Sequence, residues 1–239
     1  NTGDTFSILK TYYPKIEKSF FYKYLLRIEK KVFSEIDKLG FVADYPMQNF
    51  LNLHPHFDIN KIFYVYNGIS LEYAPKKQSD KRFATFEICC VGTICERKGQ
   101  RFIVEALRKL KENLIIPDVH FSMIGAGDTM SELLELSKKY EVSKHISFYG
   151  SSDKIDEFLI NSDIFILPSI DEGFPISILE AMRASLPIVS TKVGGIPEMI
   201  ENGQSGIFIE PSDDGVYDFL VNINKYNWAE MGEKSNKLF

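Results

Sequence analysis

The sequence predicts an α/β fold of the doubly wound type, in which helices cover both faces of a parallel sheet. From residue 83 onward, short apolar runs alternate with longer segments whose apolar residues recur at helical spacing. These apolar runs are followed by turns rich in glycine or carboxylates. In open α/β sheets, such turns at the carboxyl ends of the strands form the ligand-binding edge.

Each element of this part of the chain has its own signal. Apolar runs predict six strands, at residues 86–91, 119–124, 146–149, 164–167, 186–189 and 206–209. Helical spacing predicts helices between them, at residues 100–113, 130–140, 153–161 and 176–184, with one after the glycine-rich turn near residue 195 and one from about residue 214.

The front of the chain predicts a smaller set of elements. A long helix is expected at residues 14–39, where apolar residues recur every four positions between Pro14 and Gly40. A strand at 41–43, a helix at 45–53 and a strand at 61–66 should follow, the last ending in Asn67-Gly68. His54-Pro55-His56 is interpreted as a turn, because proline suits a turn and no further metal ligands lie nearby.

Composition excludes several classes of protein. The chain has 239 residues, 44% of them hydrophobic, as in an ordinary globular protein, and its net charge of −5 argues against nucleic-acid binding. It has no apolar run of 18 residues and no signal peptide, which predicts a cytoplasmic protein. Cys89 and Cys90 are adjacent in an expected strand, so they should face opposite sides of the sheet as core residues. Because the chain starts without methionine and stops within a helical pattern, it is expected to be part of a longer protein.

Residues 163–195 carry the most informative pattern. The apolar run at 164–167 is followed by Asp171-Glu172-Gly173-Phe174-Pro175 and then by an apolar helix that contains Glu180. Seven residues separate Glu172 from Glu180. One carboxylate should therefore lie in a loop beyond a strand's carboxyl end, and the other in the helix that follows.

These residues resemble the retaining glycosyltransferases of the GT-B architecture, the glycosyl transferases group 1 type. The paired-glutamate motif of that family stands here as Glu172-Gly173-Phe174 and Leu179-Glu180-Ala181, and two further blocks fit at residues 193–198 and 203–206. The resemblance implies two facing Rossmann-like domains. Residues 1–72 would be the C-terminal part of the acceptor domain, and residues 83–239 would form the domain that binds a nucleotide-sugar donor. Residues 73–82 would connect the two domains.

The resemblance also implies roles for individual residues. Lys98 would contact the donor diphosphate. Thr93 stands where the family commonly has an arginine, and Arg97 would compensate for the missing charge from a neighbouring position. Glu180 would hold the ribose hydroxyls and Glu172 the donor sugar, with Glu172 and Lys98 as the catalytic groups. The expected donor-binding set is Gly92, Thr93, Arg97, Lys98, Gly125, Gly127, Gly150, Ser151, Glu172, Gly173, Phe174, Pro175, Ile176 and Glu180.

No metal or cofactor is expected. The sequence has no Asp-x-Asp element, and Asp213-Asp214 are interpreted as capping a helix.

Taken singly, Gly125-Ala126-Gly127 is only a tight turn, and Glu172 could be a solvated loop carboxylate. The implied activity is transfer of a sugar from a nucleoside diphosphate sugar to a glycan or lipid-linked acceptor, with retention, in bacterial polysaccharide or glycolipid synthesis. A sugar-nucleotide epimerase of the same fold and a non-catalytic nucleotide-sugar-binding module remain alternatives.

The expected first helix leaves two interpretations open. Between Tyr12 and Lys31 it carries six basic residues against two glutamates, interleaved with aromatic side chains. The basic face is either simply solvated, or it meets an anionic bilayer at the inner face of the plasma membrane.

Overall fold

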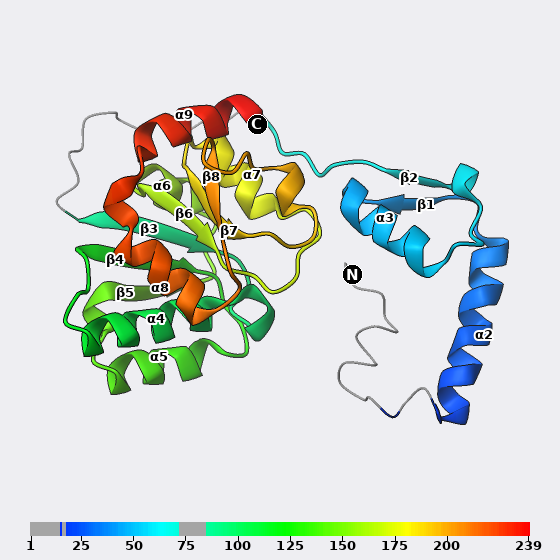
Figure 1. Ribbon diagram of the computed structural model, residues 1–239, viewed down its shortest axis with the longest axis horizontal. Helices are drawn as coiled ribbons and strands as arrows, with labels where there is room; N and C mark the ends of the chain where they lie inside the picture. Colours follow the sequence, from blue (N-terminus) through cyan, green and yellow to red (C-terminus); the bar gives the residue numbers. More distant parts are fainter. Residues whose placement is uncertain (1–14, 16–17, 72–84) are drawn as a thin grey trace.

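The computed structural model describes residue 15 and residues 18–71 and 85–239. The expected connection at residues 73–82 and both of its boundaries, as well as residues 1–14, lie outside this range. A larger α/β part follows a smaller helical part, and an extended segment after residue 64 leads from the smaller to the larger (Figure 1).

The larger part is built on one six-stranded sheet in the order β5-β4-β3-β6-β7-β8, and every neighbouring pair is parallel. This confirms the predicted doubly wound α/β class. The strands are β3 (Phe86–Val91), β4 (Val119–Ile124), β5 (Ile146–Gly150), β6 (Ile164–Leu167), β7 (Ile188–Thr191) and β8 (Gly206–Ile209).

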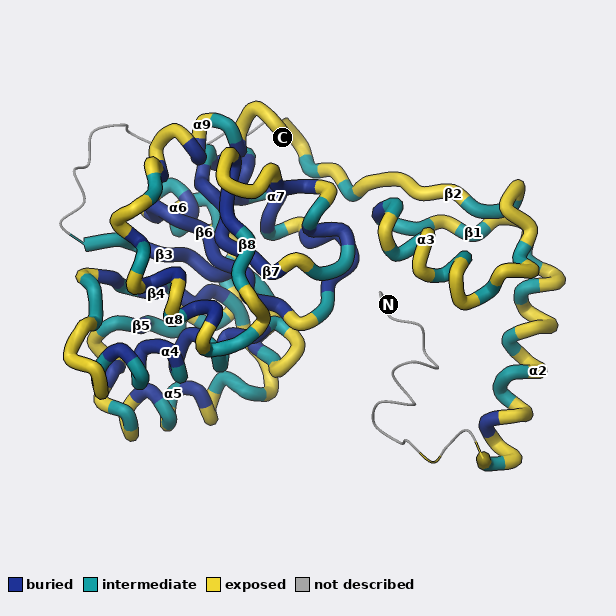
Figure 2. The backbone as a smooth tube through the Cα atoms, in the orientation of Figure 1, coloured by how far each residue is buried: buried dark blue, intermediate teal, exposed yellow. Residues whose placement is uncertain are grey.

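Helices bury their apolar stripes against both faces of this sheet, and the strands form the buried centre in Figure 2. Cys89 and Cys90 lie in opposite core clusters, as their alternation predicted. The helices are α4 (Gln100–Glu112), α5 (Met130–Lys139), α6 (Ile155–Ile160), α7 (Ile176–Arg183), α8 (Asp213–Val221) and α9 (Trp228–Leu238).

Two predicted elements of the larger part are wrong in detail. The strand expected at 186–189 begins at Ile188, because Leu186 N–H still bonds to the Ala181 carbonyl (3.0 Å) and thereby ends α7. The helix expected after the glycine-rich turn is only a 3-10 turn, Ile196–Glu198. Its backbone bonds span three residues, and the buried Met199 follows at once, so no α-helical turn forms.

The smaller part contains α2 (Phe20–Glu35), β1 (Leu39–Phe41), α3 (Asp44–Leu53) and β2 (Ile62–Tyr64). The helix expected to run to residue 39 ends at Glu35, because Leu39–Phe41 must extend to pair in parallel with Ile62–Tyr64. For the same reason the strand expected at 41–43 lies two residues earlier. The strand expected at 61–66 is confined to Ile62–Tyr64. Lys61 belongs to a preceding 3-10 turn, and β1 pairs with these three residues alone.

Aromatic rings fill the space between α2 and α3. Phe50 contacts Phe33, Phe41 and Phe57 at centroid distances of 5.2–5.4 Å, and His54 packs 4.5 Å from Phe50. This supports a packing role for His54. Among the described residues, no group of three or more His, Cys, Asp or Glu side chains is arranged to hold a metal ion. No helix in the described ranges is long and apolar enough to cross a membrane.

Candidate functional site

The order of the strands defines where a ligand can bind. The sheet grows in one direction from β3 through β4 to β5, and in the other from β6 through β7 to β8. The direction reverses between β3 and β6, so the loops after these two strands separate and leave a crevice at the carboxyl edge. These loops are residues 92–99 and 168–175, which contain most of the predicted donor-binding residues.

Glu172 is the buried carboxylate of this crevice, with 5% of its side chain exposed. Its Oε1 accepts hydrogen bonds from Lys98 Nζ at 2.6 Å and from Ser169 Oγ at 2.7 Å. The guanidinium of Arg97 lies 3.5 Å from Oε2. A buried carboxylate needs partners that replace its lost hydration, and here two basic side chains and one hydroxyl supply them.

Backbone contacts fix the two loops against each other. Arg97 donates to the Asp171 carbonyl at 2.7 Å, and its own carbonyl accepts from Ile170 N–H at 2.8 Å. Gly99 has φ of 71°, and a Cβ there would lie 2.0 Å from the Pro168 carbonyl oxygen. Only glycine permits this approach. The fold therefore brings Lys98 and Glu172, two of the residues singled out from the sequence, into direct contact.

The glycine-rich turn after β7 supports the Glu172 loop from behind. Gly194 has φ of 55°, and a Cβ on it would lie 1.7 Å from the Glu172 carbonyl oxygen. Gly195 N–H donates to the Gly173 carbonyl at 2.7 Å. The motif at residues 193–198 thus has a physical reason for its glycines, because they let one loop pack directly on the other.

Glu180 lies on α7 and is partly buried. Burial raises the pKa of its carboxyl group, an effect that Arg183 opposes and Asp156 reinforces. The guanidinium of Arg183 is itself engaged, donating to Asp156 at 2.7 Å and to the Ser70 carbonyl at 2.9 Å. Within the described residues, no side chain hydrogen-bonds to the Glu180 carboxyl group.

The two glycines after β4 are required by backbone packing. A Cβ on Gly125 would lie 1.9 Å from the Gly92 carbonyl oxygen, and one on Gly127 would lie 2.0 Å from that of Ile94. These two positions therefore require glycine without any ligand. Gly150 has φ of 71° and open space around its Cβ position, while Thr93 and Ser151 are exposed at the same edge.

The acidic pair Asp213-Asp214 lies away from the crevice. Both carboxylates bind Lys109 of α4, at 2.7 and 2.5 Å. The residue that caps α8 is Ser212, whose Oγ accepts from Gly215 N–H at 3.0 Å, so the predicted capping role belongs to the preceding residue.

A cleft of about 650 Å³ lies beside the crevice. The loops of the larger part contribute Ile170, Asp171, Glu172 and Lys192 to its wall, and the smaller part contributes mostly apolar side chains, among them Phe33, Phe41, Tyr45 and Phe50. Sequence reasoning did not single out Ser169, which bonds to Glu172, or the cleft itself. The available sequence signal for Ser169 was a serine three residues before a glutamate.

Comparison with known proteins identifies the family. Residues 74–219 match the family described as Glycosyl transferases group 1. The chain belongs to this family. Its relatives include the UDP-Gal:alpha-D-GlcNAc-diphosphoundecaprenol alpha-1,3-galactosyltransferase of Escherichia coli, with 30% identity over 179 residues. That match covers 70% of this chain and 46% of the relative. The N-acetyl-alpha-D-glucosaminyl L-malate synthase of Bacillus anthracis is 32% identical over 138 residues, which is 56% of this chain and 35% of that protein.

Solved structures show the same fold. HepE of Anabaena in complex with UDP superimposes with a TM-score of 0.72 at 17% identity, over 84% of this chain and 58% of that one. The C-terminal domain of the group 1 glycosyl transferase LpcC of Francisella tularensis gives a TM-score of 0.56 at 27% identity, over 64% of this chain and 83% of that one. The predicted GT-B class is thereby confirmed. The matches to the two curated relatives named above cover less than half the length of each relative.

Proposed function

We propose that this group 1 chain forms the donor site of a retaining hexosyltransferase. The enzyme would move a sugar from a nucleoside diphosphate sugar to an acceptor hydroxyl. The observation that carries the proposal is the buried Glu172, held by Lys98 and Ser169 at the point where the strand order reverses. A paired, buried carboxylate and ammonium at that edge are placed to bind a ligand with both hydroxyl and phosphate groups.

The diphosphate would lie against the positive groups of the crevice. Lys98 supplies one charge and Arg97, which is 46% exposed, supplies a second. The first turn of α7, from Ile176, adds backbone N–H groups and the positive end of the helix dipole. As the sugar leaves, these groups would stabilise the charge that grows on the diphosphate, and no divalent metal is needed for that step.

The two glutamates would hold different parts of the donor. Glu180 carries a carboxyl group that no described side chain bonds, and two acceptor oxygens suit the vicinal hydroxyls of a ribose. Glu172 would accept from hydroxyls of the sugar, close to the backbone of Gly173 and Phe174. Gly150 and Ser151 lie at the end of β5, where exposed backbone would meet the base.

The acceptor would enter through the 650 Å³ cleft, which opens onto Glu172 and carries apolar side chains on its far wall. Such a wall suits a glycan attached to a lipid or another apolar carrier. The galactosyltransferase of Escherichia coli named above acts on a lipid-linked sugar, and HepE was solved with UDP. We therefore favour a UDP-sugar donor and a lipid-linked acceptor, in bacterial polysaccharide or glycolipid synthesis at the cytoplasmic side of the membrane. Retention would follow if the acceptor attacks on the face from which the diphosphate leaves.

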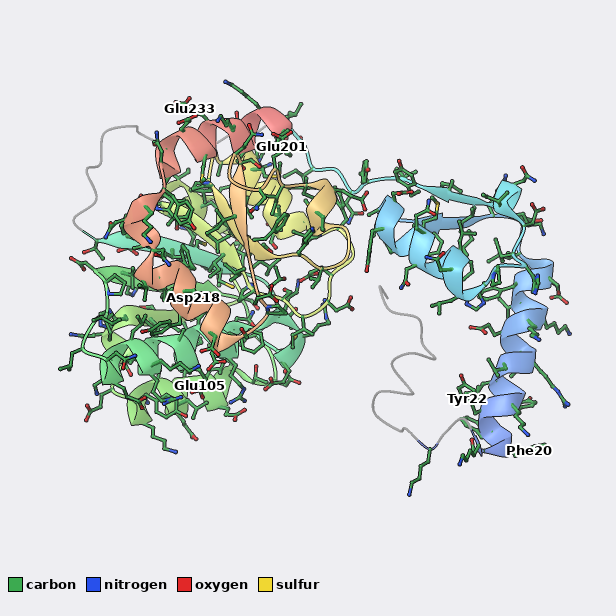
Figure 3. The ribbon with its side chains drawn as sticks, viewed as in Figure 1. Phe20, Tyr22, Glu105, Glu201, Asp218 and Glu233 are labelled. Carbon is green, nitrogen blue, oxygen red and sulfur yellow. The ribbon has the colours of Figure 1, made fainter. Side chains whose placement is uncertain are left out.

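Helix α2 would bring the protein to an anionic membrane surface. Its exposed aromatic residues include Phe20, Phe21 and Tyr24, and its basic residues include Lys23 and Arg27 (Figure 3 labels Phe20 and Tyr22). Aromatic and basic side chains along one exposed helix fit the interface of a bilayer with anionic lipid.

The deciding experiment is turnover of sugar nucleotides by the protein with lipid-linked and free glycan acceptors. We expect release of nucleoside diphosphate together with a glycoside whose anomeric configuration, read by NMR, matches that of the donor. Formation of an epimerised donor would support the epimerase alternative instead. Binding of a sugar nucleotide without turnover would support the binding-module alternative. The same assay with a chelator should give an unchanged rate.

A further inference from the structure

Glu198 lies at the contact between the smaller and the larger part, outside the groups assigned to the donor. Its carboxylate accepts hydrogen bonds from the backbone N–H groups of Asp44 at 3.0 Å and Tyr45 at 2.8 Å, the first two residues of α3. Ala43, at the N-cap position, has no side-chain oxygen to do this. Glu198 therefore caps α3 from across the molecule, and its negative charge suits the helix N-terminus.

The same carboxylate holds an aromatic residue of the smaller part. Tyr66 donates its hydroxyl to Glu198 Oε2 at 2.9 Å, and the Tyr66 ring stacks on Phe174 with centroids 4.8 Å apart and planes 29° apart. The next residue, Asn67, donates from Nδ2 to the Phe174 carbonyl at 2.8 Å. Because Phe174 is two residues from Glu172, the position of Tyr66 bears directly on the backbone beside the donor-site carboxylate.

Gly195 shows how closely the two parts approach. A Cβ on Gly195 would lie 2.7 Å from the Ala43 Cβ and 2.4 Å from the Gly173 carbonyl oxygen. Ala43 is fully buried and belongs to the core cluster of α7. The start of α3 is therefore seated on the glycine-rich turn, and Glu198 closes this contact at the surface.

We propose that Glu198 is a positioning residue for sugar transfer. By holding the first turn of α3 and Tyr66 together, it fixes the acceptor wall of the cleft relative to the Glu172 loop. Tyr45 and Glu172 both line that cleft. This inference rests on the proposed function, since alignment of two walls matters only when an acceptor must meet a donor. Within the part of the chain that the structure describes, the Glu198 carboxylate hydrogen-bonds to none of the groups proposed to hold the nucleotide, so its loss should spare nucleotide binding.

The test compares Glu198→Gln with Glu201→Gln in the full chain. Glu201 is an exposed carboxylate three residues later, labelled in Figure 3, and serves as a matched control. Hydrogen exchange at the Asp44 and Tyr45 amides should accelerate only in Glu198→Gln. Affinity for UDP should stay equal in both variants. Transfer at saturating donor should fall about fivefold in Glu198→Gln alone, less than a fully buried charged hydrogen bond would give because the site is at the surface.

A second variant separates positioning from general damage. Tyr66→Phe keeps the ring stacked on Phe174 and removes only the hydroxyl. If Tyr66 acts through Glu198, the double variant should lose transfer about as much as Glu198→Gln alone, whereas independent effects would multiply. Transfer equal to that of Glu201→Gln, or unchanged exchange at the α3 amides, overturns the Glu198 proposal. Absence of nucleotide release from any sugar nucleotide by the wild-type protein overturns the proposed function instead.

Discussion

The ammonium of Lys98 lies 2.6 Å from Glu172 Oε1, and only 12% and 5% of the two side chains are exposed. This pair joins the loop after β3 to the loop after β6, at the point where the strand order of the parallel sheet reverses. A diphosphate that takes Lys98 as its partner must therefore compete with Glu172. Glu172 would then need new donors, and the hydroxyls of the donor sugar can supply them. Arg97, whose guanidinium lies 3.5 Å from Glu172 Oε2, would still offset part of the negative charge of Glu172.

Replacing Lys98 should cost both stability and phosphate affinity. Lys98→Met removes the closer of the two basic partners of a buried carboxylate, and breaking a buried ion pair costs about 3 kcal/mol of unfolding free energy in comparable cases. Binding of UDP should weaken much more than binding of uridine, because only UDP carries the phosphate charge. Denaturant unfolding and calorimetric titration measure the two effects. Lys192→Met, which changes an exposed lysine in the wall of the neighbouring cleft, is the control.

A double variant tests whether the stability loss comes from the pair. Lys98→Met combined with Glu172→Gln removes both charges, so stability should recover part of the loss. If the double variant is as unstable as the sum of the single changes, the Lys98–Glu172 interaction is not the source.

Thr93→Arg probes the departure from the family pattern. Thr93 is exposed at the carboxyl edge of β3, where an added guanidinium could reach a bound diphosphate. We expect affinity for UDP to rise by about fivefold or more, since a charged hydrogen bond contributes about 1.5–3 kcal/mol when well placed. Uridine affinity, measured in parallel, should not change. Weaker UDP binding would mean that Arg97 already occupies the position an arginine at 93 would take.

The class of fold could be predicted from sequence because each strand and helix of the larger part carries its own local pattern. The first strand of the sheet, Phe86–Val91, is an apolar run of the predicted extent, and so is Ile164–Leu167. Errors arose where tertiary contacts override local pattern. Leu186 is apolar enough for a strand, yet its N–H completes the end of α7. Leu39 continues a helical period, yet it pairs with Ile62 in a sheet.

The site could be predicted only in part, for a related reason. Motif spacing placed Glu172 and Glu180 on a loop and the following helix, and it placed Lys98 at the same edge. It could not show that Lys98 bonds to Glu172, since 74 positions separate them and only the strand order brings them together. Nor could it show that Gly194 backs the Glu172 carbonyl or that Gly125 is required by Gly92. A glycine in a motif gives the same sequence signal whether it faces a ligand or packs against another loop.

Helix α2 should bind anionic vesicles if its exposed face meets a bilayer. We expect co-sedimentation with vesicles that contain anionic lipid and much less with neutral vesicles, with loss at high salt, because each basic residue near the surface contributes about 1 kcal/mol. Changing Lys23 and Arg27 to glutamine should weaken the binding. Equal binding to neutral and anionic vesicles would contradict the proposal and leave α2 as a helix with a solvated basic face.

The stability of the fold should depend on Glu180 in a pH-dependent way. Burial raises the pKa of this carboxyl group in the folded protein, so folding favours its protonated form. Its favourable contribution is fully present below the ordinary carboxyl pKa and is lost as pH rises through the folded value. Glu180→Gln should therefore be more stable than the wild type at pH 7, and the difference should vanish below about pH 4. Thermal unfolding across this range, with Glu201→Gln as control, measures it. An equal difference at every pH would exclude a titration effect.

The two glutamates of the motif should fail differently in binding. Glu180 is proposed to hold ribose, which is present in both UDP and the UDP-sugar. Glu180→Gln should therefore lower the affinity for both ligands by about tenfold or more, as expected for the loss of a hydrogen bond to a charged group. Glu172 is proposed to hold the sugar, so Glu172→Gln should leave UDP affinity within a few fold, while affinity for the UDP-sugar, or turnover, drops.

Calorimetric titration with UDP and with a UDP-sugar gives the four values that decide this. Because Glu172 also bonds to Lys98, its amide variant frees that ammonium, and UDP could even bind more tightly. Equal weakening of UDP in both variants, or an unchanged Glu180→Gln, would show that the roles are assigned wrongly. The fold and the family would stand in either case, because neither depends on which hydroxyls these two carboxylates bind.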